Sequence, residues 1–235
     1  MQVGLNKCDA RANEPGYRPR SNGLNWITNF YPLLAVIAAY LVGSLSFAVI
    51  VSRSMGLNDP RTYGSKNPGA TNVLRSGSKA AAVVTLLLDA FKGWLPVMLV
   101  KWFGERYGLG DGTVAMVGLA AFTGHLFPVF FRFEGGKGVA TALGVLLATS
   151  WLLGLSTGLT WLAIAYFFRY SSLASIVASV FAPVYYLFGG GVAWALDKSV
   201  ALTTTIMALL LIWRHSENIS RLVKGTESKL GKKKT

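Results

Sequence analysis

Three polar segments lie between long apolar stretches of the chain, and the first runs from Gly64 to Arg75. It combines small residues, hydroxyls and amides with basic residues. Such a loop brings backbone N–H groups and side-chain donors close to a ligand, which suits an anion. The alternative is a solvated loop of turn residues. The candidate anion-binding residues are Gly64, Ser65, Asn67, Thr71, Asn72 and Arg75.

The second segment ends in Gly-Gly-Lys-Gly at residues 135–138, directly before an apolar run that begins at Val139. Glycines at a helix N-terminus leave amides free, and the helix dipole adds positive potential. Lys137 supplies a full charge. The spacing is not that of a Walker A motif, so it predicts a phosphate site and implies no nucleotide. The alternative is a tight interfacial turn with a snorkelling lysine. The candidates are Gly135, Gly136, Lys137, Gly138 and, through its hydroxyl, Thr141.

The third segment follows the last apolar run and begins at Arg214. If the last helix continues through it, His215 and Asn218 are three residues apart and share a face. Arg214, Asn218 and Arg221 form an adjoining stripe. A basic amphipathic helix end at the membrane surface would explain the arginines, but not the pairing of a histidine with an asparagine.

Two charged residues, Asp89 and Lys92, interrupt the second apolar stretch and are three apart on one helix face. Charges at membrane depth are costly and are usually paired or line a polar cavity. A structural pair and a support for an active site both remain open. His125, shortly before Pro128, is interpreted as a structural histidine.

Composition indicates the element type that must position these segments. The 235 residues are 52% hydrophobic with a mean hydropathy of +0.45, and only 14% are charged, whereas soluble domains carry about 25%. These values predict a polytopic membrane protein. The single cysteine, Cys8, excludes a disulfide scaffold. The net charge of +13 is spread over loops, which argues against nucleic-acid binding. The few histidines and carboxylates argue against a metal site.

The apolar stretches are long enough for membrane helices, which need about 20 residues. An uncharged run over 139–168 is ambiguous, and the turn-prone residues 154–158 in its middle favour a hairpin of two short helices. These five residues also match G-x-S-x-G, but a nucleophile elbow needs a preceding strand. The other stretches are 33–51, 80–100, 113–131, 171–188 and 192–213.

Counting the hairpin as two helices gives seven transmembrane helices, two of them short, in an all-α fold. With the N-terminus outside and the C-terminus cytoplasmic, the inner loops hold most of the 23 lysines and arginines, as the positive-inside rule requires. We expect a flexible N-terminal tail over 1–24, one membrane domain over 25–228 and a basic C-terminal tail over 229–235.

Taken together, the three segments resemble the acyl-phosphate-dependent glycerol-3-phosphate acyltransferases of bacteria, the PlsY family. The matching stretches are 64–75, 124–141 and 214–227, and the resemblance covers about residues 33–228. Asp89-Ala-Phe-Lys-Gly93 and Tyr170-Ser-Ser-Leu173 also fit it. Lys66 departs from it, since a small residue is expected there. The His-x4-Asp motif of acyl-CoA-dependent enzymes is absent: Phe130 and Ser220 stand five after the two histidines.

The resemblance implies a seven-helix enzyme of the bacterial inner membrane with a cytoplasmic site. It implies transfer of a fatty acyl group from acyl phosphate to the sn-1 hydroxyl of glycerol 3-phosphate, the first step of phospholipid synthesis, with no cofactor. Membrane lipid and a soluble acyl-phosphate-producing enzyme are the further partners it suggests. It assigns catalysis to His215, Asn218, Ser65 and Lys137, and substrate binding to the other candidates above with Arg214 and Ser172. His215 is either the base or a binding group beside a substrate phosphate that acts as base.

Two other functions compete with an acyltransferase. A transporter of phosphate compounds would place its site at mid-membrane, often between repeats, but the donors gather at one face and no repeat is visible. A membrane anchor that binds anionic lipid would have no use for Asn67, Asn72 or His215.

Overall fold

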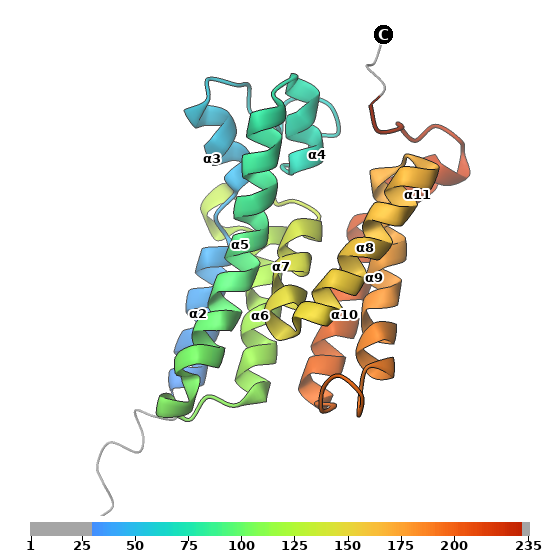
Figure 1. Ribbon diagram of the computed structural model, residues 1–235. Coiled ribbons are helices and arrows are strands. Elements are labelled where there is room, and N and C mark those ends of the chain that lie inside the picture. Colours follow the sequence, from blue (N-terminus) through green and yellow to red (C-terminus); the bar gives the residue numbers. More distant parts are fainter. Residues whose placement is uncertain (1–29, 232–235) are drawn as a thin grey trace, which may run out of the picture.

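The computed structural model describes residues 30–231, and within them the apolar stretches are helical (Figure 1). No strand occurs in this part of the chain, only an isolated bridge between Gly190 and Trp194. The predicted all-α class is therefore confirmed, while the predicted tail over 1–24 lies outside the described residues. The helices are α2 (Tyr31–Gly43), α3 (Phe47–Ser54), α4 (Ala70–Val73), η1 (Leu74–Ser76), α5 (Lys79–Phe103), η2 (Gly104–Tyr107), α6 (Asp111–Leu126), η3 (Val129–Phe131), α7 (Val139–Thr149), α8 (Trp151–Phe168), α9 (Ser171–Phe188), α10 (Lys198–Arg214) and α11 (Ser216–Val223).

The helices form a membrane bundle. Four of those described, α5, α6, α8 and α9, are long and apolar enough to cross a bilayer, and the number rises to six if the bent pairs α2–α3 and α10–α11 each count as one span. The described chain starts at the lower end of Figure 1 with α2 and finishes beside α11 at the other, here called the site end. A count of seven and the orientation across the membrane stay predictions.

The run over 139–168 forms two helices as predicted, but the predicted position of the break is wrong. The chain turns at Ser150, which has an extended backbone, and residues 154–158 continue inside α8. A Cβ at Gly154 would lie 2.6 Å from the Leu147 Cα, so this glycine permits close packing of α8 on α7 rather than a turn. With only 11 residues, α7 is too short to cross the bilayer.

Two other apolar stretches are bent rather than straight. The stretch 33–51 breaks after Gly43, where α2 and α3 meet at 42°. The final helix does not continue through the third polar segment, because α10 and α11 meet at 57° with His215 at the junction. The condition for His215 and Asn218 to share a helix face, that the last helix continues, is therefore not met, although both side chains are buried.

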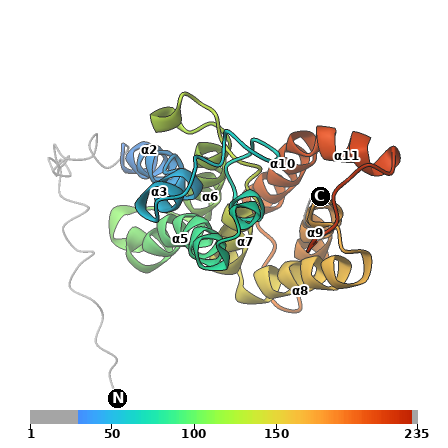
Figure 2. The ribbon, with the colours of Figure 1, turned by 90° about the horizontal axis from the view of Figure 1, so that it is seen from above.

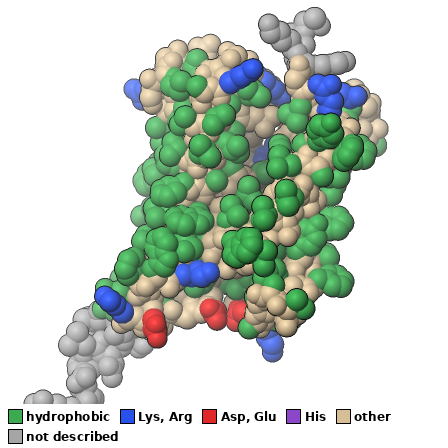
Figure 3. Space-filling view, viewed as in Figure 1, with side chains coloured by type: hydrophobic (Ala, Val, Ile, Leu, Met, Phe, Trp, Pro, Cys, Tyr) green, Lys and Arg blue, Asp and Glu red, His purple; other side chains and the backbone are tan. Residues whose placement is uncertain are grey.

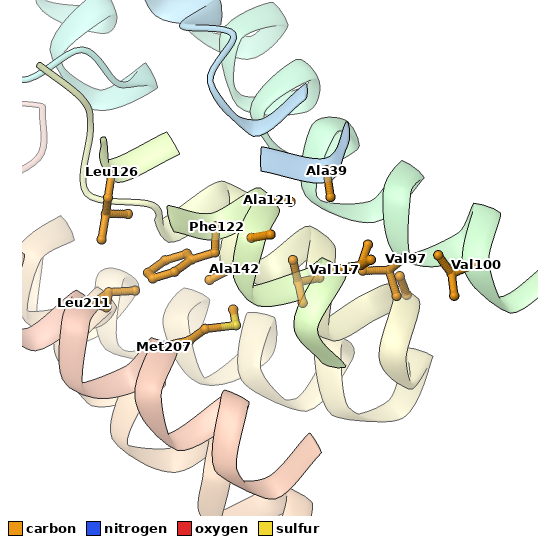
Figure 4. Close-up of a cluster of buried hydrophobic side chains, with 13 residues drawn as sticks. Ala39, Val97, Val100, Val117, Ala121, Phe122, Leu126, Ala142, Met207 and Leu211 are labelled. Carbon is orange, nitrogen blue, oxygen red and sulfur yellow. The ribbon is translucent and has the colours of Figure 1, made fainter. Parts of the chain in front are cut away.

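Small residues bring the helices of the core together. A Cβ on Gly43 would lie 2.2 Å from the Ala121 carbonyl oxygen, and one on Gly144 would lie 1.9 Å from that of Ala90. Such contacts let helix backbones approach closely in a membrane. Phe122 of α6 fills the space towards Met207 and Leu211 of α10 (Figure 4). Seen from above, α7 lies between the group of α2, α5 and α6 and the group of α8, α9 and α10 (Figure 2).

Side-chain types divide along the bundle axis. Hydrophobic side chains cover its flank, and basic side chains gather at the site end (Figure 3). Lys101, Arg106 and Lys198 belong to the opposite end, where α5 finishes and α10 begins. This asymmetry is what the positive-inside rule leads one to expect. The basic residues at the site end are Arg53, Arg61, Lys66, Arg75, Lys79, Arg132, Lys137, Arg169, Arg214, Arg221, Lys224 and Lys229.

Candidate active site

The three polar segments meet at the site end, as the sequence predicts. The Lys137 Nζ donates a hydrogen bond to the Asn218 Oδ1, which joins the second segment to the third. The Arg75 Nη2 donates to the Ser228 Oγ at 2.9 Å, which joins the first segment to the chain that follows α11. Residues far apart in the sequence therefore surround one region.

Glycines shape the loop before α7. Gly138 has a φ of +83°, which favours glycine. A Cβ on Gly136 would lie 2.1 Å from the His125 Nε2 and 2.8 Å from the Pro68 carbonyl oxygen, so this position also requires glycine. The Gly136 N–H donates to the His125 carbonyl at 3.1 Å. The prediction that this amide is free for a phosphate is therefore wrong: it satisfies a carbonyl at the end of α6 that lacks a helical partner.

Arg214 holds the same loop from the other side. Its Nη2 donates to the Gly135 carbonyl at 2.9 Å, and its Nε donates to the Gly136 carbonyl at 3.2 Å. These contacts orient the backbone on which Lys137 stands. Arg214, expected as a substrate-binding residue, thus has a defined loop-positioning role in the structure.

A network of side chains extends from Lys137 through Asn218 to Glu227. The Glu227 Oε1 accepts hydrogen bonds from the Asn218 Nδ2 at 2.6 Å and the Ser172 Oγ at 2.7 Å, and its Oε2 accepts one from the Arg221 Nε at 2.7 Å. These donors hold the pKa of Glu227 below its usual range against the opposing effect of burial. Burial also lowers the pKa of Lys137, to about 8. Ser172, expected from the resemblance, thus lies in the same network as Asn218.

His215 is buried at the junction of α10 and α11, with 2% of its surface exposed. Its Nδ1 lies 2.8 Å from the Leu211 carbonyl oxygen. Because a carbonyl only accepts, Nδ1 carries the hydrogen and Nε2 keeps a free lone pair. Burial, and then the charge of Lys137, lower the pKa of His215 to about 4. The imidazole is therefore neutral near pH 7 and able to accept a proton.

Asn72 organises the first segment. It is buried, its Nδ2 donates to the Pro60 and Tyr63 carbonyls at 2.6 and 3.1 Å, and its Oδ1 accepts from the Ser65 N–H at 3.1 Å. Its polar atoms are therefore engaged within the segment, so the structure places it as a positioning residue rather than as a direct contact for substrate. A Cβ on Gly64, which has a φ of +61°, would lie 2.3 Å from the same Oδ1.

Other residues of this segment present donors at the surface. Ser65, Thr71 and Arg75 are exposed, and Asn67 is half-buried. The Thr71 Oγ1 lies 3.4 Å from the Ser171 Oγ. Lys66, the departure from the family pattern, is exposed and has a φ of +54°, a backbone conformation uncommon outside glycine.

Thr141 does not stand where a ligand could reach it. It is fully buried, and its carbonyl oxygen would lie 2.3 Å from a Cβ on Gly93 of α5. No hydrogen-bond partner for its Oγ1 is found among residues 30–231. The first turn of α7 packs against α5, so the expected phosphate contact from this hydroxyl is not supported.

Glu227 and Arg221 also join the network around Asn218, although neither is among the residues predicted for the site. The sequence signal for Arg221 is its place in the stripe of Arg214, Asn218 and Arg221, and that for Glu227 is the end of the matching stretch. The first residues of the predicted C-terminal tail over 229–235 contact the start of α9. The Leu230 N–H donates to the Arg169 carbonyl at 2.7 Å, and Lys229 lies over the ring of Tyr170.

A helical membrane bundle with hydroxyl, amide, imidazole and ammonium groups gathered at one end defines an integral membrane enzyme. The chain belongs to the glycerol-3-phosphate acyltransferase family, whose model matches residues 33–225. It is an acyltransferase embedded in a membrane.

Similar proteins cover nearly the same length. A glycerol-3-phosphate acyltransferase of Albidiferax ferrireducens is 70% identical over 216 residues, which span 92% of this chain and 96% of the relative. A glycerol-3-phosphate acyltransferase of Burkholderia pseudomallei is 62% identical over 202 residues, which span 86% of this chain and 97% of the relative.

Two crystal structures of PlsY, an integral membrane glycerol 3-phosphate acyltransferase, match the fold. Its glycerol 3-phosphate form has a TM-score of 0.78 at 40% identity, covering 85% of this chain and 96% of that one. Its lysophosphatidic acid form has a TM-score of 0.76 at 39% identity, covering 85% and 95%.

Proposed function

We propose that this enzyme transfers a fatty acyl group from acyl phosphate to the sn-1 hydroxyl of glycerol 3-phosphate. The products are 1-acyl-glycerol 3-phosphate (lysophosphatidic acid) and inorganic phosphate. The observation that carries the proposal is the contact between Lys137 and Asn218, because it joins the glycine loop to α11 and brings a cation whose charge acts on the neutral His215. The forms in which the similar PlsY was crystallised, with glycerol 3-phosphate and lysophosphatidic acid, support the acceptor and the product.

Both substrates carry phosphate, so the site must accommodate two anions. Lys137, Asn218 and Ser172 form one set of donors, and Ser65, Asn67, Thr71 and Arg75 form another. The Glu227 carboxylate accepts hydrogen bonds from Asn218 and Ser172 and holds both side chains in place. The acyl chain can extend into the bilayer beside the bundle, so the protein need not enclose it.

The chemistry is one acyl transfer. The glycerol hydroxyl oxygen forms a bond to the carbonyl carbon of acyl phosphate, and the bond from that carbon to the phosphate oxygen breaks. Phosphate leaves with the bonding electrons, and the hydroxyl proton passes to the His215 Nε2 or to a substrate phosphate oxygen. Because a mixed anhydride is already activated, positioning of the two substrates and stabilisation of the developing negative charge carry most of the catalysis.

The asymmetry of basic residues supports a site end that faces the cytoplasm, in the inner membrane of a bacterium. A soluble enzyme that makes acyl phosphate would then deliver the donor from the same side. The basic residues that surround the site would favour approach of both anionic substrates by electrostatic attraction.

The choice of donor is tested with purified protein in detergent or nanodiscs. Acyl phosphate and glycerol 3-phosphate should give lysophosphatidic acid and phosphate in equal amounts, while acyl-CoA of the same chain length should give none. Mass spectrometry of the lipid and a phosphate assay measure the two products. Product from acyl-CoA but not from acyl phosphate would overturn the donor assignment.

The rate should depend on pH through Lys137. Its pKa of about 8 means that the ammonium loses its proton as pH rises past that value. Because kcat/KM reports the free enzyme, kcat/KM should fall above about pH 8. Lys137→Arg, whose guanidinium stays protonated, should shift this decline upward by at least about one pH unit. An unchanged alkaline limb in that variant would contradict the assignment, since substrate ionisation is common to both proteins.

A further inference from the structure

Three buried ionisable groups form a cluster beside the glycine loop of residues 135–138. The Asp89 Oδ1 lies 2.9 Å from the Lys92 Nζ and 3.6 Å from the His125 Nδ1. The side chains are 2–7% exposed. The predicted pairing of Asp89 with Lys92 is confirmed, and His125 joins it. Such groups are costly in a membrane and mark a function or a necessary structural contact.

Lys92 has a structural reason to be there. Its Nζ donates to the Leu45 carbonyl at 2.6 Å, at the break between α2 and α3 where helical hydrogen bonds are lost. It also lies over the ring of Phe47. Asp89 balances its charge. This accounts for the ion pair but leaves His125 unexplained.

His125 connects the ion pair to the glycine loop. One edge of its ring faces Asp89, and the opposite edge, at Nε2, lies against Gly136 so closely that a Cβ there would be 2.1 Å away. Its carbonyl accepts the Gly136 N–H. The same part of α5 also supports the far side of the loop, because Gly93 packs on Thr141 in the first turn of α7.

We propose that Asp89 is a positioning residue that acts through His125 to fix the glycine loop, and so the place of Lys137. Arg214 donates to the carbonyls of the loop, and the His125 ring contacts the loop at Gly136. The inference rests on the proposed role of Lys137. It predicts that a change in the cluster weakens binding of the substrate that Lys137 contacts and leaves binding of the other substrate unchanged. The reason is that a displaced side chain loses mainly its own contacts.

The experiment compares two variants of nearly equal size, His125→Leu and His125→Asn. Both leave Asp89 paired with Lys92, so neither leaves an uncompensated charge in the membrane. Leucine cannot interact with Asp89, whereas the asparagine amide can replace the Nδ1 of the ring. KM is measured separately for acyl phosphate and glycerol 3-phosphate, and Lys137→Arg shows which of the two KM values depends on Lys137.

His125→Leu should raise the KM that depends on Lys137 by about tenfold, the scale of a small misplacement in a preorganised site. It should change the KM for the other substrate by less than about twofold. His125→Asn should restore at least part of the loss. The double variant Asp89→Leu/Lys92→Met, which removes both charges and the oxygen that faces the His125 ring, should reproduce the effect of His125→Leu. Asp197→Asn is the control, since its amide oxygen can still cap α10 at the opposite end, and it should leave both KM values unchanged.

A fall in active enzyme with both KM values unchanged would show a purely structural cluster and overturn the inference. So would equal KM values for the leucine and asparagine variants. Neither outcome would affect the donor assignment, which the unmodified enzyme tests. Absence of turnover with acyl phosphate in the unmodified enzyme would instead refute the proposed function, and the KM comparison would then be made with the donor it accepts.

Discussion

Lys137→Ala is expected to lower kcat/KM by at least about 100-fold, the scale seen when a key electrostatic contact to developing charge is removed. The side chain is the only cation provided by the loop between Gly135 and Gly138, and it reaches across to Asn218 of α11. Its loss removes both the charge for a phosphate and the link between two segments of the site. Initial rates over a grid of both substrate concentrations give the measurement.

Two further variants make this result specific. Lys137→Arg keeps the charge but not the compact ammonium, and we expect it to retain more activity than alanine. Lys198→Ala removes an exposed lysine at the first residue of α10, at the opposite end of the bundle, and should stay within about twofold of the unmodified enzyme. Near-normal turnover of Lys137→Ala would refute a phosphate site at the glycine loop.

His215→Ala is expected to lower kcat by about 100-fold or more while changing KM little, as for loss of a general base. The neutral ring, held through its Nδ1 by the Leu211 carbonyl, directs a free lone pair from Nε2. Its pKa of about 4 keeps it in the accepting form across the physiological range. Pre-steady-state and steady-state kinetics with both substrates separate turnover from binding.

His215→Asn distinguishes chemistry from shape. The asparagine amide can still donate to the Leu211 carbonyl but has no basic nitrogen. If the ring is the base, this variant is as slow as alanine; if the ring only maintains the α10–α11 junction, activity recovers. A rise in KM with normal kcat in the alanine variant would assign His215 to binding, and a substrate phosphate would then be the remaining base.

The loop residues show which features of the site can be predicted from the sequence. The glycines, Lys137, His215 and Asn218 were identified because their types are unusual between apolar stretches. Their hydrogen-bond partners are not predictable from residue type. Gly136, Arg214 and Asn72 are of types that often bind ligands, but here they donate to backbone carbonyls of neighbouring residues. Glu227 is not predicted because it and Glu217, the two carboxylates of the third segment, have no spacing that signals a site.

The sequence by itself determined a helical membrane protein, the approximate apolar stretches and three polar segments that meet at one end. It could do so because burial of backbone in lipid requires long apolar helices, and because charged residues are rare in them. Only the tertiary structure decided where the chain turns, as at Ser150, and which donors remain available. Those choices depend on contacts between distant helices, such as Gly154 with Leu147 or His125 with Gly136, whose distances no local pattern encodes.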